Sequence, residues 1–93
     1  KYDTFALVDA LGRRDRKNLW VLYRRAIDKG EAPEALHGML FWKVKTMLLN
    51  SFFGPYKEEE LYDLADCHIT VLHDSRRGMH ELETGVEVVV LGV

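Results

Sequence analysis

One segment of the chain, from Pro33 to about Phe53, is apolar over more than half of a helix circumference and limits what the rest can fold into. Residues at helical spacing form one stripe along it: Leu36, Leu40, Val44, Met47 and Ser51. Phe41, Leu48 and Phe52 widen this stripe. Pro33 suits the first turn of a helix. Because so wide an apolar surface must be covered by other elements, we predict a central, most buried helix over residues 33–53.

Helical periodicity also marks the two segments before it. Asp3 or Thr4 is a suitable N-cap for a first short helix, which Gly12 ends. Asp15 is a suitable N-cap for a second helix, whose apolar residues recur at helical spacing: Leu19, Leu22, Tyr23 and Ala26. Gly30 closes this helix, in the position where helix C-termini favour a left-handed residue.

Two more helices are predicted after the turn at residues 54–55. The acidic run 58–60 fits the first turn of the fourth helix, which ends at Gly78. Its stripe is Leu61, Leu64, Ala65, His68, Leu72 and Ser75. A last helix over about 80–91 carries Leu82, Val86, Val89 and Val90. Residues 88–90 also suit a strand, but no second strand exists to pair with it, so we predict a helix.

The resulting fold class is all-α, a five-helix bundle with short connections and no repeat. A length of 93 residues, with 47% hydrophobic and 30% charged side chains, suits one domain that spans residues 1–93. Because the chain begins at Lys1 and lacks the order of a signal peptide, we expect it to be a piece of a longer protein.

Several classes of protein are disfavoured. The single Cys67 excludes an intramolecular disulfide and no zinc-finger spacing occurs, which favours a cytoplasmic protein without a metal. His68, His73 and His80 do not have the spacing of a helical metal site. No apolar run approaches the roughly 18 residues of a membrane span, so we expect no membrane partner. Because the chain is short and lacks a catalytic pair, we expect no enzymatic activity and no cofactor.

The net charge of −2 hides a division along the chain. Residues 1–53 contain ten Lys/Arg against six Asp/Glu, which gives +4, whereas residues 54–93 contain three against nine, which gives −6. Such a dipolar surface argues weakly against a domain whose whole surface binds nucleic acid. It favours a protein that meets other proteins at two different faces.

Two groups of residues are candidate binding sites. The basic set Arg13, Arg14, Arg16, Lys17, Arg24 and Arg25 would suit phosphates or an acidic partner. Phe41 and Trp42 are adjacent on one helix and point in different directions, so one of them can leave the core and bind a partner, with Lys45 beside it. The alternative to a protein-binding role is therefore a small helical nucleic-acid-binding domain that uses the basic set.

The order of several short motifs resembles one family over nearly the whole chain. These motifs are residues 5–17 (FALVDALGRRDRK), Leu22-Tyr23, the step 30–33 (GEAP), and the late stretch His73, Asp74, Arg76, Arg77, Gly78, Leu82 and Glu83. Together they resemble the C-terminal domain of the delta subunit of the bacterial DNA polymerase III clamp loader. Gly85 stands where that family has Ala, which costs a helix about 1 kcal/mol of propensity.

The resemblance implies a role in DNA replication. Members of the family use this helical domain as one segment of a circular collar of five such domains, and an ATPase-like module lies upstream of it. The implied partners are the other clamp-loader subunits, and DNA is contacted only through the assembled complex that loads the sliding clamp. The delta subunit does not itself hydrolyse ATP.

Overall fold

The computed structural model describes residues 4–93, which form five α-helices and, within that range, no strand. The helices are α1 (Thr4–Gly12), α2 (Arg16–Asp28), α3 (Pro33–Leu49), α4 (Glu58–Arg76) and α5 (Leu82–Leu91). The all-α, five-helix prediction is confirmed, and residues 88–90 are helical as expected. Of the two N-caps considered for the first helix, Asp3 lies outside the described residues and Thr4 is the first helical residue. No helix of residues 4–93 is long and apolar enough to cross a membrane.

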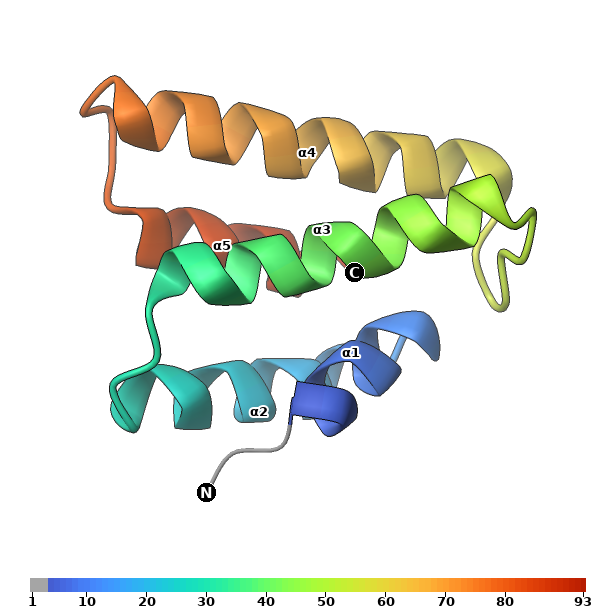
Figure 1. Cartoon of the computed structure of the whole chain (residues 1–93), viewed down its shortest axis with the longest axis horizontal. Coiled ribbons are helices and arrows are strands. Elements are labelled where there is room, and N and C mark those ends of the chain that lie inside the picture. Colours follow the sequence, from blue (N-terminus) through green and yellow to red (C-terminus); the bar gives the residue numbers. More distant parts are fainter. Residues whose placement is uncertain (1–3) are drawn as a thin grey trace.

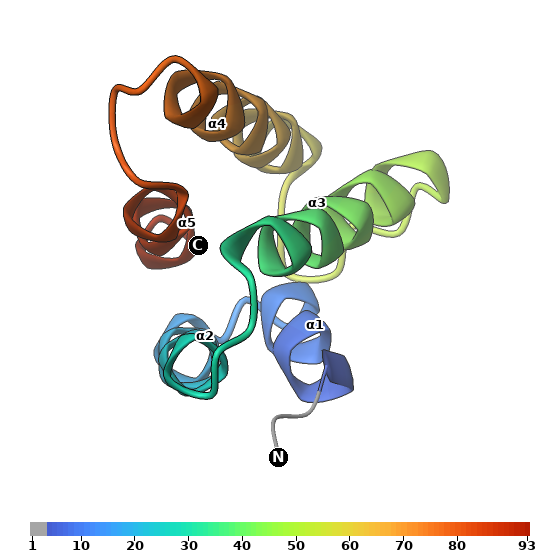
Figure 2. The same ribbon diagram turned by 60° about the vertical axis from the view of Figure 1, so that its left-hand side comes forward.

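The helices are arranged around two central elements (Figures 1 and 2). The helix α3 packs against α1, α4 and α5, and α5 packs against α2, α3 and α4. The central position predicted for residues 33–53 is therefore shared by α3 with the shorter α5. The helix α4 covers one side of this pair, and α1 and α2 cover the other.

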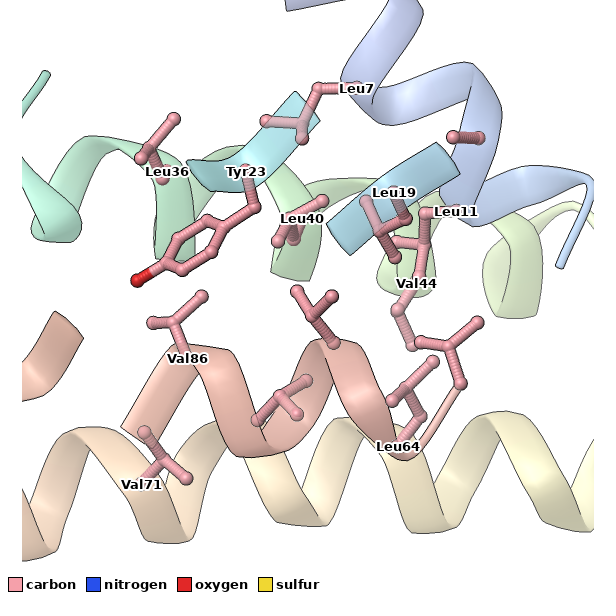
Figure 3. Packing of buried hydrophobic residues seen from close by; sticks show 14 of the residues in the cluster. Leu7, Leu11, Leu19, Tyr23, Leu36, Leu40, Val44, Leu64, Val71 and Val86 are labelled. Atoms are coloured by element: carbon pink, nitrogen blue, oxygen red, sulfur yellow. The ribbon is translucent and has the colours of Figure 1, made fainter. Parts of the chain in front are cut away.

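One continuous core joins all five helices (Figure 3). Its largest fully buried side chains are Tyr23, Leu7, Leu11, Leu19, Leu36, Leu40, Leu61, His68, Val44, Val86, Val89 and Val90. Most of them are the stripe positions that the helical periodicity predicts. Periodicity is therefore a sound guide to the core of this chain.

The predicted end of the third helix is wrong. The helix α3 stops at Leu49 and not at Phe53, because Ser51 adopts a left-handed conformation with φ 52°. The amide of Phe52 then donates to the carbonyl of Met47 (3.0 Å), which closes the helix end. As a result Ser51 and Phe52 are exposed, and the reversed chain brings Tyr56 into the core.

The other helix ends follow the local signals closely. The Asp15 side chain accepts a hydrogen bond from the amide of Asn18 (3.3 Å), as predicted for the N-cap of α2. Gly30 and Gly78 both have positive φ and follow α2 and α4, as predicted. The first helix ends at Gly12, but Arg14 is the residue with positive φ (59°) there. The last helix begins two residues later than expected, at residue 82.

Candidate functional site

An exposed aromatic surface covers the junction of α1 and α3. Trp42 is 57% exposed and, with Phe5, Val8 and Lys43, lines a shallow hollow of about 520 Å³. Phe52 is 68% exposed and lines a neighbouring hollow that also contains Lys43. We call these five residues the α1–α3 surface. Of the two adjacent aromatics considered from the sequence, Trp42 is thus the one that leaves the core.

Phe41 and Lys45 lie elsewhere on α3. The Phe41 ring stacks on the ring of His68 from α4, with a centroid distance of 5.6 Å and an interplanar angle of 19°. The Lys45 ammonium lies 4.8 Å from the Phe41 centroid, within cation–π range. The three residues predicted as one interface are therefore divided, and Trp42 alone belongs to the α1–α3 surface.

Three members of the basic set bind carboxylates of the chain itself. Arg14 donates two hydrogen bonds of 2.9 Å to Glu60, and this hydrogen bonding lowers the pKa of the Glu60 carboxyl. Arg24 donates to Glu83 (3.1 Å) and Glu87 (3.2 Å). Arg13 pairs with Asp9 at 2.8 Å, and two longer ion pairs join Arg13 to Asp15 (3.9 Å) and Arg24 to Asp28 (3.8 Å).

Some of these ion pairs join the positively charged half of the chain to the negatively charged half. Arg14 and Arg24 belong to the +4 half of the chain, and their partners Glu60, Glu83 and Glu87 belong to the −6 half. These ion pairs therefore hold the two halves of the chain together within the fold. The Arg14 and Arg24 side chains that form them are not available to a phosphate or to an acidic partner. The basic residues left over are Arg16, Lys17 and Arg25, which are exposed.

The late motif forms the connection between α4 and α5. Arg76 ends α4, Arg77 is its C-cap, and the amide of Met79 donates to the carbonyl of Asp74 across the left-handed Gly78 (2.9 Å). His73 is exposed in the last turn of α4, and Leu82 begins α5 as a buried residue. Glu83 comes next, and its backbone carbonyl accepts a hydrogen bond from the buried Tyr23 hydroxyl (2.7 Å). The motif and the basic set thus meet at Arg24 and Glu83.

Two histidines form a buried contact between α3 and α4 that the sequence spacing does not reveal. A ring nitrogen of His37 (Nε2) lies 2.7 Å from the carbonyl oxygen of His68, and the two ring centroids are 5.1 Å apart. The Nδ1 of His68 bonds to the carbonyl of Leu64 (2.9 Å), whereas its buried Nε2 has no partner among the described residues. Burial lowers the pKa of His68 to about 4. The periodicity of α4 did indicate that His68 is buried, but His37 lies 31 residues away.

A groove of about 260 Å³ lies beside Cys67, between α4, α5 and the turn after α1. Arg14 and Glu60 line it and are held by each other, and Tyr56 contributes its ring. Burial raises the pKa of the Cys67 thiol, which keeps it protonated and weakly nucleophilic. Within residues 4–93 no three histidine, cysteine, aspartate or glutamate side chains gather as a metal site.

Comparison with protein-family models, curated proteins and solved structures gives no match for this chain. The exposed feature that best fits a binding role is the α1–α3 surface, because three exposed aromatic side chains line its two neighbouring hollows, which share Lys43.

Proposed function

We propose that this chain is a protein-binding helical domain and, more specifically, the collar domain of a delta-like subunit of a bacterial DNA polymerase III clamp loader. In this role it binds other clamp-loader subunits and has no catalytic activity of its own. It takes part in the loading of the sliding clamp, and it meets DNA only through the assembled complex. The rest of the subunit supplies the ATPase-like module.

The observation that carries the proposal is the exposure of Trp42 beside Phe5 on the α1–α3 surface, with Phe52 exposed in the neighbouring hollow. Aromatic side chains bury a large area at a small entropic cost, and tryptophan is among the residues that most often dominate the energy of protein interfaces. Water contact with three such rings is unfavourable, so a surface of this kind gains stability when a partner covers it.

The clamp-loader assignment draws its support from the motif order and from the fold class. A five-helix bundle is the architecture that the resemblance implies. The steps 30–33 and 73–83 lie at helix ends and connections in it, whereas residues 5–17 span α1 and the start of α2, and Leu22-Tyr23 lie within α2. The basic set gives less support to the nucleic-acid alternative, because Arg13, Arg14 and Arg24 are paired with carboxylates of the chain. A phosphate would have to compete with each of these pairs.

The proposal is tested by mixing the chain with the other purified clamp-loader subunits and measuring co-elution in size-exclusion chromatography. The wild-type chain is expected to co-elute, and Trp42→Asp is expected to abolish co-elution because it places a charge in the buried centre of the interface. Met79→Asp is the matched control, since Met79 is 67% exposed and lies away from the α1–α3 surface. Circular dichroism establishes that both variants are folded.

The outcomes distinguish an error in the clamp-loader assignment from an error in the choice of the contact surface. If the wild-type chain does not co-elute, the clamp-loader assignment is wrong. If Trp42→Asp and Met79→Asp both co-elute like the wild type, the domain assembles through another face and the α1–α3 surface is not the subunit contact.

A further inference from the structure

Two faces of the bundle carry charges that the internal ion pairs leave over. The outer side of α4 has four carboxylates, which we call the acidic α4 face: Glu58, Glu59, Asp63 and Asp66. The outer side of α2 and its C-cap have three cations, which we call the basic α2 face: Lys17, Arg25 and Lys29. Arg16 instead donates a hydrogen bond to the carbonyl of Leu91 on α5 (3.4 Å). All seven residues of the two faces are exposed, and within residues 4–93 none of them forms an ion pair.

The two faces lie on opposite sides of the molecule. The helix α2 packs against α1 and α5, and α4 packs against α3 and α5, so that α5 stands between them. Figures 1 and 2 both show α4 and α2 at opposite edges of the bundle. The two helices also run in the same direction (Figure 1). A second copy, moved without rotation, therefore brings its α2 alongside the α4 of the first copy, in parallel.

Each face combines charges with exposed apolar side chains. Tyr62 (55% exposed) and Ile69 (52% exposed) lie on α4, four residues before Asp66 and three residues after it. Val21 is 37% exposed and lies four residues from both Lys17 and Arg25 on α2. An apolar centre with a charged rim is the usual composition of a protein interface.

Like charges are neighbours within each face. Glu59 and Asp63 are four residues apart on α4, Asp63 and Asp66 are three apart, and Arg25 and Lys29 are four apart on α2. Such pairs repel each other and destabilise a helix. The positive end of the helix dipole compensates the carboxylates of the first turn only, and Asp63 and Asp66 lie beyond it. Opposite charges from a partner would relieve the repulsion on the acidic α4 face, whereas on α2 the exposed Asp28, three residues from Arg25, already offsets part of it.

We propose that the acidic α4 face binds the basic α2 face of a second copy of this chain. The contact is head-to-tail, since a different surface of each copy takes part, and every complex leaves one face of each kind open at its ends. It uses neither Trp42 nor the α1–α3 surface, so it holds or fails independently of the clamp-loader assignment. Because charges lie at its rim, salt weakens it.

The experiment is a charge swap followed by sedimentation equilibrium. One variant, Asp63→Lys with Asp66→Lys, reverses the acidic α4 face. The other, Lys17→Glu with Arg25→Glu, reverses the basic α2 face. The control is Glu34→Lys with Glu81→Lys, which changes the net charge as much as the first variant but lies on neither face. All three pairs are exposed in the structure, and circular dichroism verifies their folding.

The wild type and the control are expected to self-associate at about 50 mM salt, with a dissociation constant that rises at least about tenfold at about 0.5 M salt. Each face variant alone is expected to be monomeric. Their equimolar mixture is expected to associate again, because the native basic α2 face of the first variant can bind the native acidic α4 face of the second.

Three results would overturn the proposal: a monomeric wild type at low salt, self-association that survives reversal of either face, or no complex in the mixture. A fluorescent DNA duplex provides a further arm. If the chain stays monomeric but binds the duplex with an affinity that falls steeply with salt and is lost in Lys17→Glu with Arg25→Glu, the basic α2 face is a nucleic-acid surface and not a contact between copies.

Discussion

Arg14 and Glu60 lie 46 residues apart in the chain and hold each other through two parallel hydrogen bonds of 2.9 Å. The guanidinium of Arg14 also lies 5.0 Å from the centroid of the Tyr56 ring, within cation–π range. Glu60 in turn accepts a hydrogen bond from the amide of Lys57 (2.7 Å), which caps the start of α4. One carboxylate thus connects the turn after α1 to the first turn of α4.

The first prediction concerns this pair. Glu60→Gln is expected to lower the midpoint of thermal unfolding, because it removes the charge that Arg14 pairs with, while the amide oxygen can still cap α4. The effect is modest, since about a third of each side chain is exposed to water, and about 0.5 M salt should reduce it further. A double-mutant cycle with Arg14→Met measures the coupling. A coupling that does not fall with salt would contradict an electrostatic pair.

The hydroxyl of Tyr56 supports the second prediction. It donates a buried hydrogen bond of 2.6 Å to the carbonyl of Leu11. Tyr56→Phe is expected to lower the free energy of unfolding by about 1 kcal/mol, since a hydrogen bond is lost with little change in shape. Tyr62→Phe is the control, because Tyr62 is 55% exposed and its change should be near zero. Urea denaturation measures both, and equal effects would show that the buried bond contributes nothing.

Local signals account for most of the fold that could be predicted. The cap at Asp15, the left-handed Gly30 and Gly78, and the buried stripes each depend on residues within one or two helical turns of each other. The end of α3 could not be predicted in this way, because Ser51 is a non-glycine residue with positive φ and no local breaker precedes it. The reversal there brings Tyr56 into the core, where its hydroxyl bonds to the carbonyl of Leu11, 45 residues earlier in the chain.

The functional residues were harder to predict than the fold. The adjacency of Phe41 and Trp42 on a helix predicts that they point in different directions, but whether one of them leaves the core, and which one, depends on the packing of α3 against its neighbours. The basic set was visible in the sequence, yet its pairing with Glu60 and Glu83 depends on tertiary packing. Charge composition therefore overestimates the number of cations available to a partner.

The third prediction concerns Gly85, where helix propensity alone would favour alanine. A Cβ there would lie 2.5 Å from Val71 Cγ1 and 2.7 Å from His80 Cε1, since α5 packs closely on α4 at this residue. The steric cost of overpacking, about 1–3 kcal/mol, exceeds the propensity gain of about 1 kcal/mol. Gly85→Ala should therefore lower the free energy of unfolding by about 1 kcal/mol in urea denaturation. A more stable variant would show that the two helices separate at little cost.

Ser51 gives the opposite expectation for a glycine substitution, and this is the fourth prediction. Its φ of 52° is unfavourable for a side chain with a Cβ, and the residue is exposed. Ser51→Gly is expected to raise the free energy of unfolding by about 0.5–1 kcal/mol. The matched control Ser75→Gly lies within α4 and should lower it by about the same amount. Equal signs for the two variants would exclude a backbone origin.

The fifth prediction concerns acid sensitivity at His68. The folded pKa of about 4 lies below the ordinary value of 6.5, because burial disfavours the charged ring and the neighbouring His37 offers no negative charge. Between these two pH values the unfolded chain binds more protons than the folded chain, so the free energy of unfolding falls as pH is lowered from 6.5. At 1.36 kcal/mol per pH unit the loss reaches about 3 kcal/mol near pH 4.

The test follows the free energy of unfolding from pH 7 to pH 5, where most carboxylates stay ionised and the signal of the histidine dominates. His68→Leu removes the titrating ring and is expected to flatten the profile, although it changes the packing against Phe41. His73→Leu is the control for the same substitution at an exposed histidine of the same helix. If the slope persists in His68→Leu, another group is the source of the acid sensitivity, because this variant lacks the His68 ring.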